Sequence, residues 1–79
     1  MKKCVIKWTN KYSNEEGFVK EIKLKKGYFI NTFKKDEARV YTDNNAKGLI
    51  TLLGRTKESI NNIFTIIDVT NKEDWYGFR

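Results

Sequence analysis

The sequence predicts an α+β domain: a small, mostly antiparallel sheet in the order β-β-β-α-β, with one helix packed on one face. Residues 3–9 alternate polar and apolar side chains with the period of two that is typical of a half-buried strand. Three further stretches, 17–24, 28–33 and 62–69, are rich in β-branched and aromatic residues. Between residues 42 and 54 the period changes to that of a helix.

The first strand, residues 3–9, has two unlike faces. The face expected to meet the helix is apolar and consists of Cys4, Ile6 and Trp8. The face expected to point outward is largely basic and consists of Lys3, Val5 and Lys7. Since successive side chains of a strand point to opposite sides, the pattern favours a sheet with one covered face.

Residues 17–24 and 28–33 are predicted to form a hairpin, because the short KKG connection ends in Gly27, which is free to take a positive φ. One face of the earlier strand consists of Phe18, Ile22 and Leu24, and the other of Val19, Glu21 and Lys23. Lys20 interrupts the apolar face and has three explanations: an edge position, a side chain that extends to water, or a β-bulge. Residues 39–41 are expected to form a short extended piece.

The helix is expected to begin after Thr42 or Asp43, which are good N-cap residues, and to end at Gly54. Its buried stripe has helical spacing and consists of Ala46, Leu49, Ile50 and Leu53. Gly48 lies inside the helix at a cost of about 1 kcal/mol relative to alanine. We expect it to permit close packing against the sheet. The outer face, with Asn44, Asn45, Lys47, Thr51 and Arg55, is expected to be plain solvent surface.

The last strand, residues 62–69, has apolar side chains on both faces, which favours a central position covered on both sides. Residues 57–62 before it are expected to be a loop or a loose turn. We predict one domain, 1–79, in which 71–79 form an aromatic C-terminal tail. One helix of about three turns cannot cover both sheet faces. The second face is therefore expected to be solvated, covered by the tail, or used for binding.

The sequence is poor in the groups that catalysis and metal binding need. It has no histidine, the commonest general base and metal ligand, and only one cysteine. Its carboxylates come mostly as neighbours in polar turns, and neighbours on an extended chain point to opposite sides. We therefore predict no enzyme, no metal site and no cofactor. Cys4 is expected to act as a small hydrophobic core residue, with a reactive thiol as the alternative.

The protein is expected to be cytoplasmic. No stretch approaches the roughly 20 apolar residues of a membrane span. The apolar run near the N-terminus is broken by Lys7, which argues against a signal peptide. A single cysteine cannot form an internal disulfide, as expected in a reducing compartment.

Positive charge is concentrated in the first half of the chain. Residues 1–35 hold ten lysines and three glutamates, whereas residues 36–79 hold six basic and seven acidic residues. A basic surface attracts nucleic acid or an acidic protein. The competing explanation is a solvated surface with ordinary cross-strand Lys–Glu pairs, in a protein whose lysine content reflects AT-rich coding.

Two features are candidates for a binding site. On the outward face of the first three strands, lysines would neutralise phosphates while aromatic rings stack on bases. In the tail, tryptophan, tyrosine and arginine are residues typical of binding hot spots, although the tail has two structural uses as alternatives: folding back over the sheet, or pairing with a second copy. The candidate binding residues are Lys3, Lys7, Lys20, Lys23, Lys25, Lys26, Tyr28, Trp75, Tyr76, Phe78 and Arg79.

Four segments in series, CVIKWTN, GYFINTF, EARVYTDNNAKGLITLL and IFTIIDV, resemble short proteins encoded by phages and prophages of low-GC Gram-positive bacteria. The matching pieces are residues 5–8, 27–29, 38–42 with Ala46, and 64–69. The resemblance implies a bacterial host cell and a non-catalytic binder that switches off a host or defence machine, anti-CRISPR proteins among them. It carries over no functional residue, and the aromatic tail lies outside it.

The leading hypothesis is a stoichiometric binding protein of phage or mobile-element type. It would act as a monomer or homodimer on a host protein or nucleoprotein complex, and not on a membrane. Lysines of residues 1–35 would steer it, and exposed aromatic residues of the tail, together with Tyr12, would anchor it. The alternative is direct nucleic-acid binding through the lysine and aromatic face of the sheet. A small assembly protein of a virion is a third hypothesis.

Overall fold

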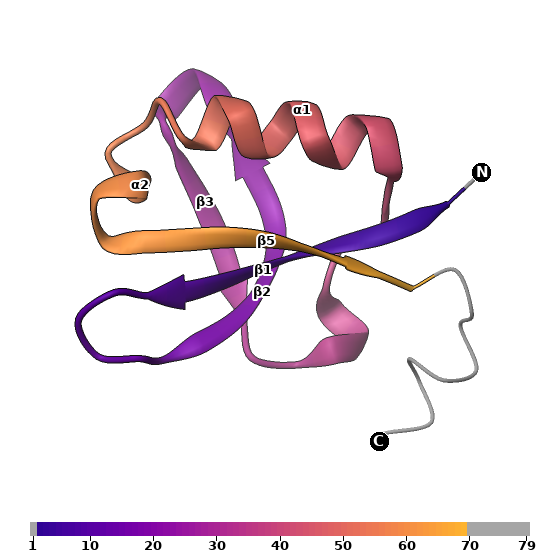
Figure 1. Ribbon diagram of the computed structural model, residues 1–79, viewed down its shortest axis with the longest axis horizontal. Helices are drawn as coiled ribbons and strands as arrows, with labels where there is room; N and C mark the ends of the chain where they lie inside the picture. Colours follow the sequence, from indigo (N-terminus) through magenta and orange to yellow (C-terminus); the bar gives the residue numbers. More distant parts are fainter. Residues whose placement is uncertain (1, 70–79) are drawn as a thin grey trace.

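The computed structural model describes residues 2–69 as an α+β domain built on a five-stranded antiparallel sheet (Figure 1). The strands are β1 (Lys3–Asn10), β2 (Glu16–Lys23), β3 (Tyr28–Thr32), β4 (Tyr41–Thr42) and β5 (Asn62–Asp68). The helices are α1 (Asp43–Leu53) and α2 (Glu58–Asn61), with 3-10 turns η1 (Leu24–Lys26) and η2 (Lys35–Glu37). α1 packs against β1 and β5. The predicted fold class is confirmed, and the segment predicted as a loop or a loose turn before the last strand contains the four-residue helix α2.

β1 is the central strand of the sheet. One of its edges pairs with β5 over the whole length of that strand, from Cys4 opposite Asp68 to Asn10 opposite Asn62. Its other edge is shared: β2 pairs with residues 7–9, and β4 pairs with the first two residues of β1. β3 adds to the far edge of β2. The central position predicted for residues 62–69 is therefore wrong, because within residues 2–69 β5 pairs only with β1.

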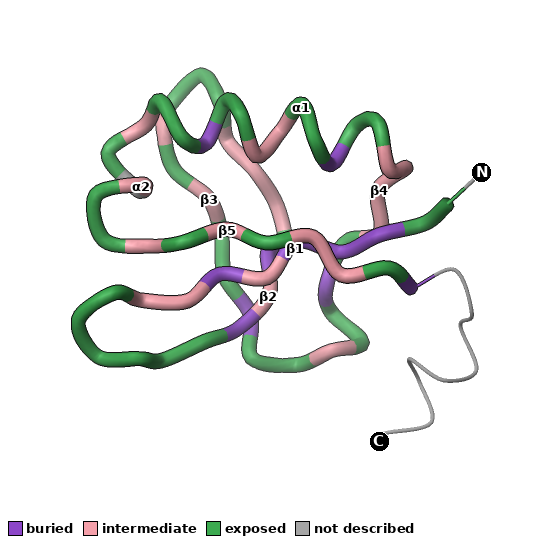
Figure 2. The backbone as a smooth tube through the Cα atoms, in the orientation of Figure 1, coloured by how far each residue is buried: buried purple, intermediate pink, exposed green. Residues whose placement is uncertain are grey.

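Two hydrophobic clusters lie on opposite faces of β1, in which four of the eight residues are buried (Figure 2). On the α1 side, the buried residues are Cys4, Ile6, Trp8, Val19 and Ala46, which confirms the predicted inward face of the first strand. On the other side, the buried residues are Val5, Ala38 and Val69, with Phe18, Val40 and Ile67 packed against them. Val5 lies on the face opposite Cys4, Ile6 and Trp8, as the alternation predicts, but it is buried there, because the segment after η2 covers part of this second face.

A β-bulge in β2 explains why its two faces differ from the predicted ones. The register places Val19 opposite Asn31 and Glu21 opposite Ile30, so Lys20 is the extra residue. A bulge shifts the alternation of side chains by one position. Val19 therefore packs in the same cluster as Ile22, whereas Phe18 packs in the cluster on the opposite face. Of the three explanations for Lys20, the bulge is confirmed, and the predicted grouping of Phe18 with Ile22 is wrong.

α1 begins and ends where the sequence predicts. The Thr42 side chain accepts a hydrogen bond from the backbone N–H of Asn45 at 3.3 Å, which satisfies one of the free donors of the first turn. The Gly54 N–H donates to the Ile50 carbonyl at 2.9 Å and ends the helix. Ala46 and Leu53 of the predicted stripe are buried. None of the helices in residues 2–69 is long and apolar enough to cross a lipid bilayer.

Two glycines have opposite surroundings. Gly17 lies opposite Trp8 in the β1–β2 pair, and a Cβ there would approach the Trp8 ring to 2.8 Å and the Thr32 carbonyl oxygen to 2.8 Å. Gly48 is exposed on α1, and a Cβ there would meet no atom within 4 Å. The expectation that Gly48 permits close packing against the sheet is therefore wrong. Gly17 instead leaves room within the sheet for the Trp8 ring and the Thr32 carbonyl.

We predict that Gly17→Ala lowers the free energy of unfolding by about 1–3 kcal/mol, because either the indole or a strand must move. Gly48→Ala is the matched control and should raise it by about 1 kcal/mol, since alanine favours the helix and meets no neighbour. Urea unfolding followed by tryptophan fluorescence measures both. Equal stability of the Gly17 variant and the wild type would contradict the tight contact with Trp8.

Candidate binding surface

Four of the predicted binding residues come together at the tip of the β2–β3 hairpin. Lys23, the last residue of β2, lies opposite Tyr28, the first residue of β3, and Lys25 and Lys26 lie in the η1 turn between them. We call residues 22–28 the hairpin tip. The two strands pair from Phe18 opposite Thr32 up to the tip, with the bulge at Lys20 between, so a paired ladder supports the tip.

The turn is held by local backbone geometry. Gly27 has φ 76°, in the left-handed region that glycine adopts without strain, as predicted. Its N–H donates to the carbonyl of Lys23 at 2.9 Å and lies 3.2 Å from that of Leu24. These contacts close the chain over a single 3-10 turn and leave Leu24, Lys25 and Lys26 exposed.

The hairpin tip combines positive charge with apolar surface. Leu24 and Tyr28 are 41% and 39% exposed. A shallow hollow of about 340 Å³ is lined by Ile22, Lys23, Leu24, Lys25 and Lys26. Lys23 forms an ion pair with Glu21 at 3.0 Å, but within the described part of the chain no carboxylate pairs with Lys25 or Lys26. The sequence predicted the charge here; it did not predict the exposure of Leu24.

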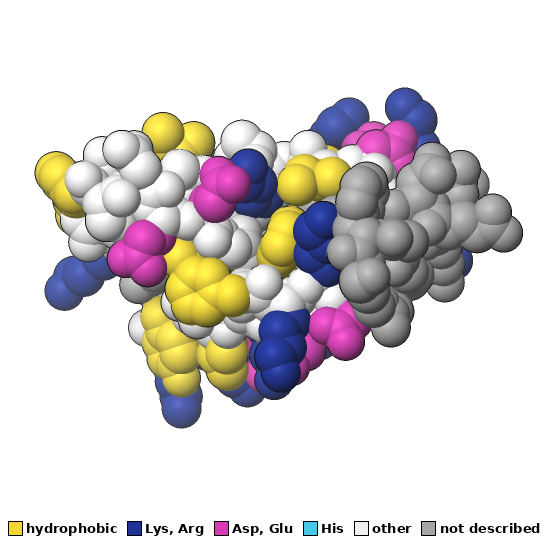
Figure 3. All heavy atoms as spheres, turned by 90° about the horizontal axis from the view of Figure 1, so that it is seen from below, with side chains coloured by type: hydrophobic (Ala, Val, Ile, Leu, Met, Phe, Trp, Pro, Cys, Tyr) yellow, Lys and Arg dark blue, Asp and Glu magenta, His cyan; other side chains and the backbone are white. Residues whose placement is uncertain are grey.

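The other predicted lysines do not join this group. Lys7 pairs with Glu16 at 2.9 Å, and Lys20 pairs with Glu37 at 3.6 Å. Lys3 lies near the start of β1, opposite Thr42. Figure 3 shows the face away from α1, where basic and acidic side chains are interleaved. A continuous lysine face is therefore not formed on this side, and ordinary Lys–Glu pairs, the competing explanation, account for Lys7 and Lys20.

The remaining candidates lie in the tail. Trp75, Tyr76, Phe78 and Arg79 fall outside the described residues, so their proposed role stays a prediction. Tyr12, the further proposed anchor, lies in the loop between β1 and β2 and is 76% exposed. It is separated in sequence from the hairpin tip by most of β2.

Cys4 has the environment of a core residue. Its side chain is 1% exposed, and its thiol lies 3.8 Å from the Asp43 carboxylate, to which it donates. Burial, followed by the negative charges of Asp43 and Asp68, raises the pKa of the Cys4 thiol above its ordinary value. Cys4 is therefore a protonated, enclosed thiol, in agreement with the expected small hydrophobic residue.

Metal-binding groups do not gather in the described residues: within 2–69, no three Cys, Asp or Glu side chains lie close enough together to hold a metal ion. The absence of an enzymatic activity stays a prediction from composition. In comparisons with known proteins, no family model, curated protein or solved structure matched this chain. The resemblance to phage-encoded proteins therefore also stays a prediction.

We predict that Cys4 of the folded protein reacts with Ellman's reagent only as fast as the protein opens, because the thiol is both enclosed and protonated. In concentrated guanidinium chloride the reaction should be immediate. Thr51→Cys, which places a thiol on the exposed side of α1, is the control and should react at once in the folded state. Immediate reaction of the wild-type thiol under native conditions would show that reagents reach it.

Proposed function

We propose that this protein is a non-catalytic binding protein that docks the hairpin tip onto an acidic surface of a partner protein. The observation that carries the proposal is the pair Lys25 and Lys26, which have no acidic partner within residues 2–69 and stand beside exposed Leu24 and Tyr28. The partner's carboxylates would supply the missing counter-charges, and its apolar side chains would cover the leucine and tyrosine.

Docking through the hairpin tip has a low free-energy cost. A lysine that already pairs with a glutamate exchanges one ion pair for another on binding, whereas Lys25 and Lys26 gain one. The hairpin is ordered by its ladder and by Gly27, so little conformational freedom is lost when the tip docks. Tyrosine is enriched at binding hot spots because it buries a large, rigid ring at low entropic cost.

The class of partner follows from the sequence resemblance. We propose a host protein or nucleoprotein complex of a bacterial cell, with an immune effector such as a CRISPR complex as the leading example. Inhibition by occupancy needs no catalytic group, which suits a chain without histidine. Trp75, Tyr76, Phe78 and Arg79 remain candidates for a second anchor, with Tyr12 as a further one.

Direct nucleic-acid binding is the second candidate function, and the hairpin tip also favours it, since lysines beside an exposed tyrosine suit a phosphate backbone with a stacked base. The small number of lysines without a glutamate partner limits the affinity for nucleic acid. Lys7 and Lys23 are paired with glutamates, so the tip offers chiefly Lys25 and Lys26. Two neutralised phosphates correspond to a slope of about −1.4 in a plot of log affinity against log salt for a single strand.

We predict that a photo-reactive benzoylphenylalanine in place of Tyr28 captures the partner in a bacterial lysate. Excess wild-type protein should suppress the capture, and Lys25→Gln/Lys26→Gln should compete roughly tenfold less well, because two ion pairs of up to about 1 kcal/mol each are lost. Lys2→Gln/Lys47→Gln changes the net charge equally, away from the tip, and should compete like the wild type. Equal competition by both double variants would refute docking through the tip.

The two candidate functions are separated by fluorescence anisotropy of labelled single- and double-stranded oligonucleotides at several salt concentrations. Docking on a protein predicts no saturable binding at physiological salt. Saturable binding whose salt slope falls in Lys25→Gln/Lys26→Gln would replace the protein partner with a nucleic acid.

A further inference from the structure

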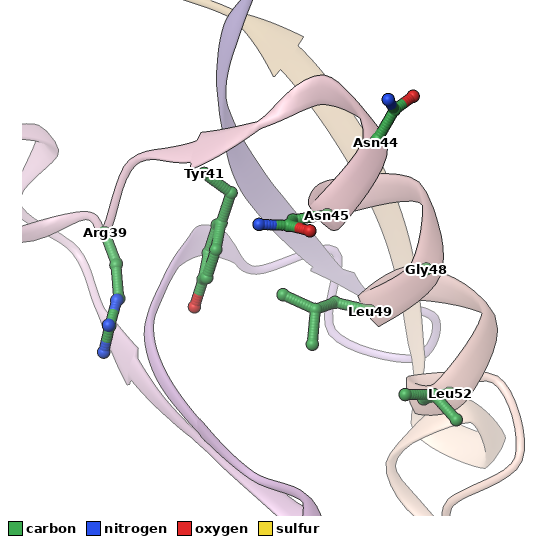
Figure 4. Close-up of a pocket in the computed structure, with 7 residues that line it drawn as sticks. All are labelled: Arg39, Tyr41, Asn44, Asn45, Gly48, Leu49 and Leu52. Carbon is green, nitrogen blue, oxygen red and sulfur yellow. The ribbon is translucent and has the colours of Figure 1, made fainter.

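A groove of about 450 Å³ lies between β4 and α1, and none of the residues of the hairpin tip line it. It is lined by Arg39, Tyr41, Asn44, Asn45, Gly48, Leu49 and Leu52. Figure 4 shows the side chains of Arg39 and Tyr41 extending in the same direction from one wall, and Asn45 and Leu49 projecting toward Tyr41 from the helix. The two asparagines belong to the helix face that the sequence pattern assigns to plain solvent surface.

The polar end of the groove is cationic and rich in donors. Arg39 carries the only charge among the lining side chains, and within the described residues no carboxylate forms an ion pair with it. Its guanidinium lies 5.9 Å from the centre of the Tyr41 ring. Burial, opposed by Arg39 and assisted by Glu21, raises the pKa of Tyr41, so its hydroxyl is a neutral donor at physiological pH. A guanidinium beside a hydroxyl is suited to a carboxylate.

The apolar end of the groove contains a glycine that the fold does not require. Gly48 lies in the middle of α1 with a backbone conformation open to any residue, and a Cβ there would meet no atom within 4 Å. Neither strain nor packing therefore explains a residue that weakens the helix. Gly48 lines the groove together with Leu49 and Leu52, and Leu52 is 41% exposed. A residue that weakens its own helix and does not improve packing is expected mainly at functional sites.

From these observations we infer that the groove binds the C-terminal residue of a peptide chain with an apolar side chain. The carboxylate meets Arg39 and the Tyr41 hydroxyl, and the apolar side chain lies over Gly48 against Leu49 and Leu52. Asn45 offers an amide that can pair with the peptide backbone. The groove is open along one side, which suits one residue at the end of a longer chain better than a free small molecule, whose surface a pocket normally encloses. This inference does not depend on the hairpin tip.

The test is a titration of the ¹⁵N-labelled full chain with three N-acetylated tetrapeptides, Gly-Ser-Gly-Leu, Gly-Ser-Gly-Val and Gly-Ser-Gly-Phe, each as free acid and as C-terminal amide. We expect at least one free acid to shift the amide signals of Asn45, Gly48 and Leu49 in a saturable way, and its amide to bind at least about tenfold more weakly. Arg39→Gln should produce the same loss for the free acid.

A second pair of variants controls for folding. Gly48→Leu fills the groove with a strong helix former and should abolish the shifts while the thermal midpoint stays at or above that of the wild type. Thr51→Leu, on the exposed side of the same helix, should bind like the wild type. Equal affinity of acid and amide, or no shift with any of the six peptides, overturns the inference. Equal affinity of N-acetyl-leucine and the leucine tetrapeptide assigns the groove to small carboxylic acids instead.

Discussion

The rest of the structure depends on the burial and pairing of β1. Its two edges contact three strands, and its two faces are covered by α1 on one side and by residues 38–40 on the other. Four of the nine buried hydrophobic residues in the described chain, Cys4, Val5, Ile6 and Trp8, come from this one strand. A domain of this size buries only about 60% of the surface that its unfolded chain exposes, so its core is thin and depends strongly on this one strand.

Both candidate surfaces follow from the way two strands share one edge of β1. β2 pairs with β1 only at residues 16–18. Beyond them, the bulge at Lys20 bends β2, which continues paired with β3 alone. The edge of β1 at Lys3 and Cys4 is thereby left for β4, which leads directly into the N-cap of α1. The hairpin tip is the end of the β2–β3 pair that lies beyond the residues of β2 paired with β1. The groove is the space between β4 and α1, the helix that follows it.

Periodicity in the sequence predicts the elements well and their neighbours poorly. The period of two predicts β1 and the helical stripe predicts α1, because both patterns depend only on residues that are close in sequence. The bulge at Lys20 breaks the alternation within one strand, so the faces of Phe18 and Val19 could not be assigned. Apolar residues on both faces of β5 indicate that both faces are covered. They do not show whether the strand is central in the sheet, because an edge strand covered by a helix on one face and a loop on the other has the same sequence pattern. Likewise, a count of lysines does not reveal that Lys7 and Lys20 have glutamate partners, since register and topology create those pairs.

The two surfaces differ in how well composition alone can explain them. AT-rich coding produces lysine, asparagine and isoleucine freely, so Lys25 and Lys26 by themselves are weak evidence of selection for binding. The same bias works against glycine, whose codons begin with two guanines. Gly48 is therefore unexplained by coding bias, by backbone conformation and by packing. A chain with so thin a core loses helix stability by keeping it. A requirement for the open groove beside Leu49 and Leu52 accounts for that loss.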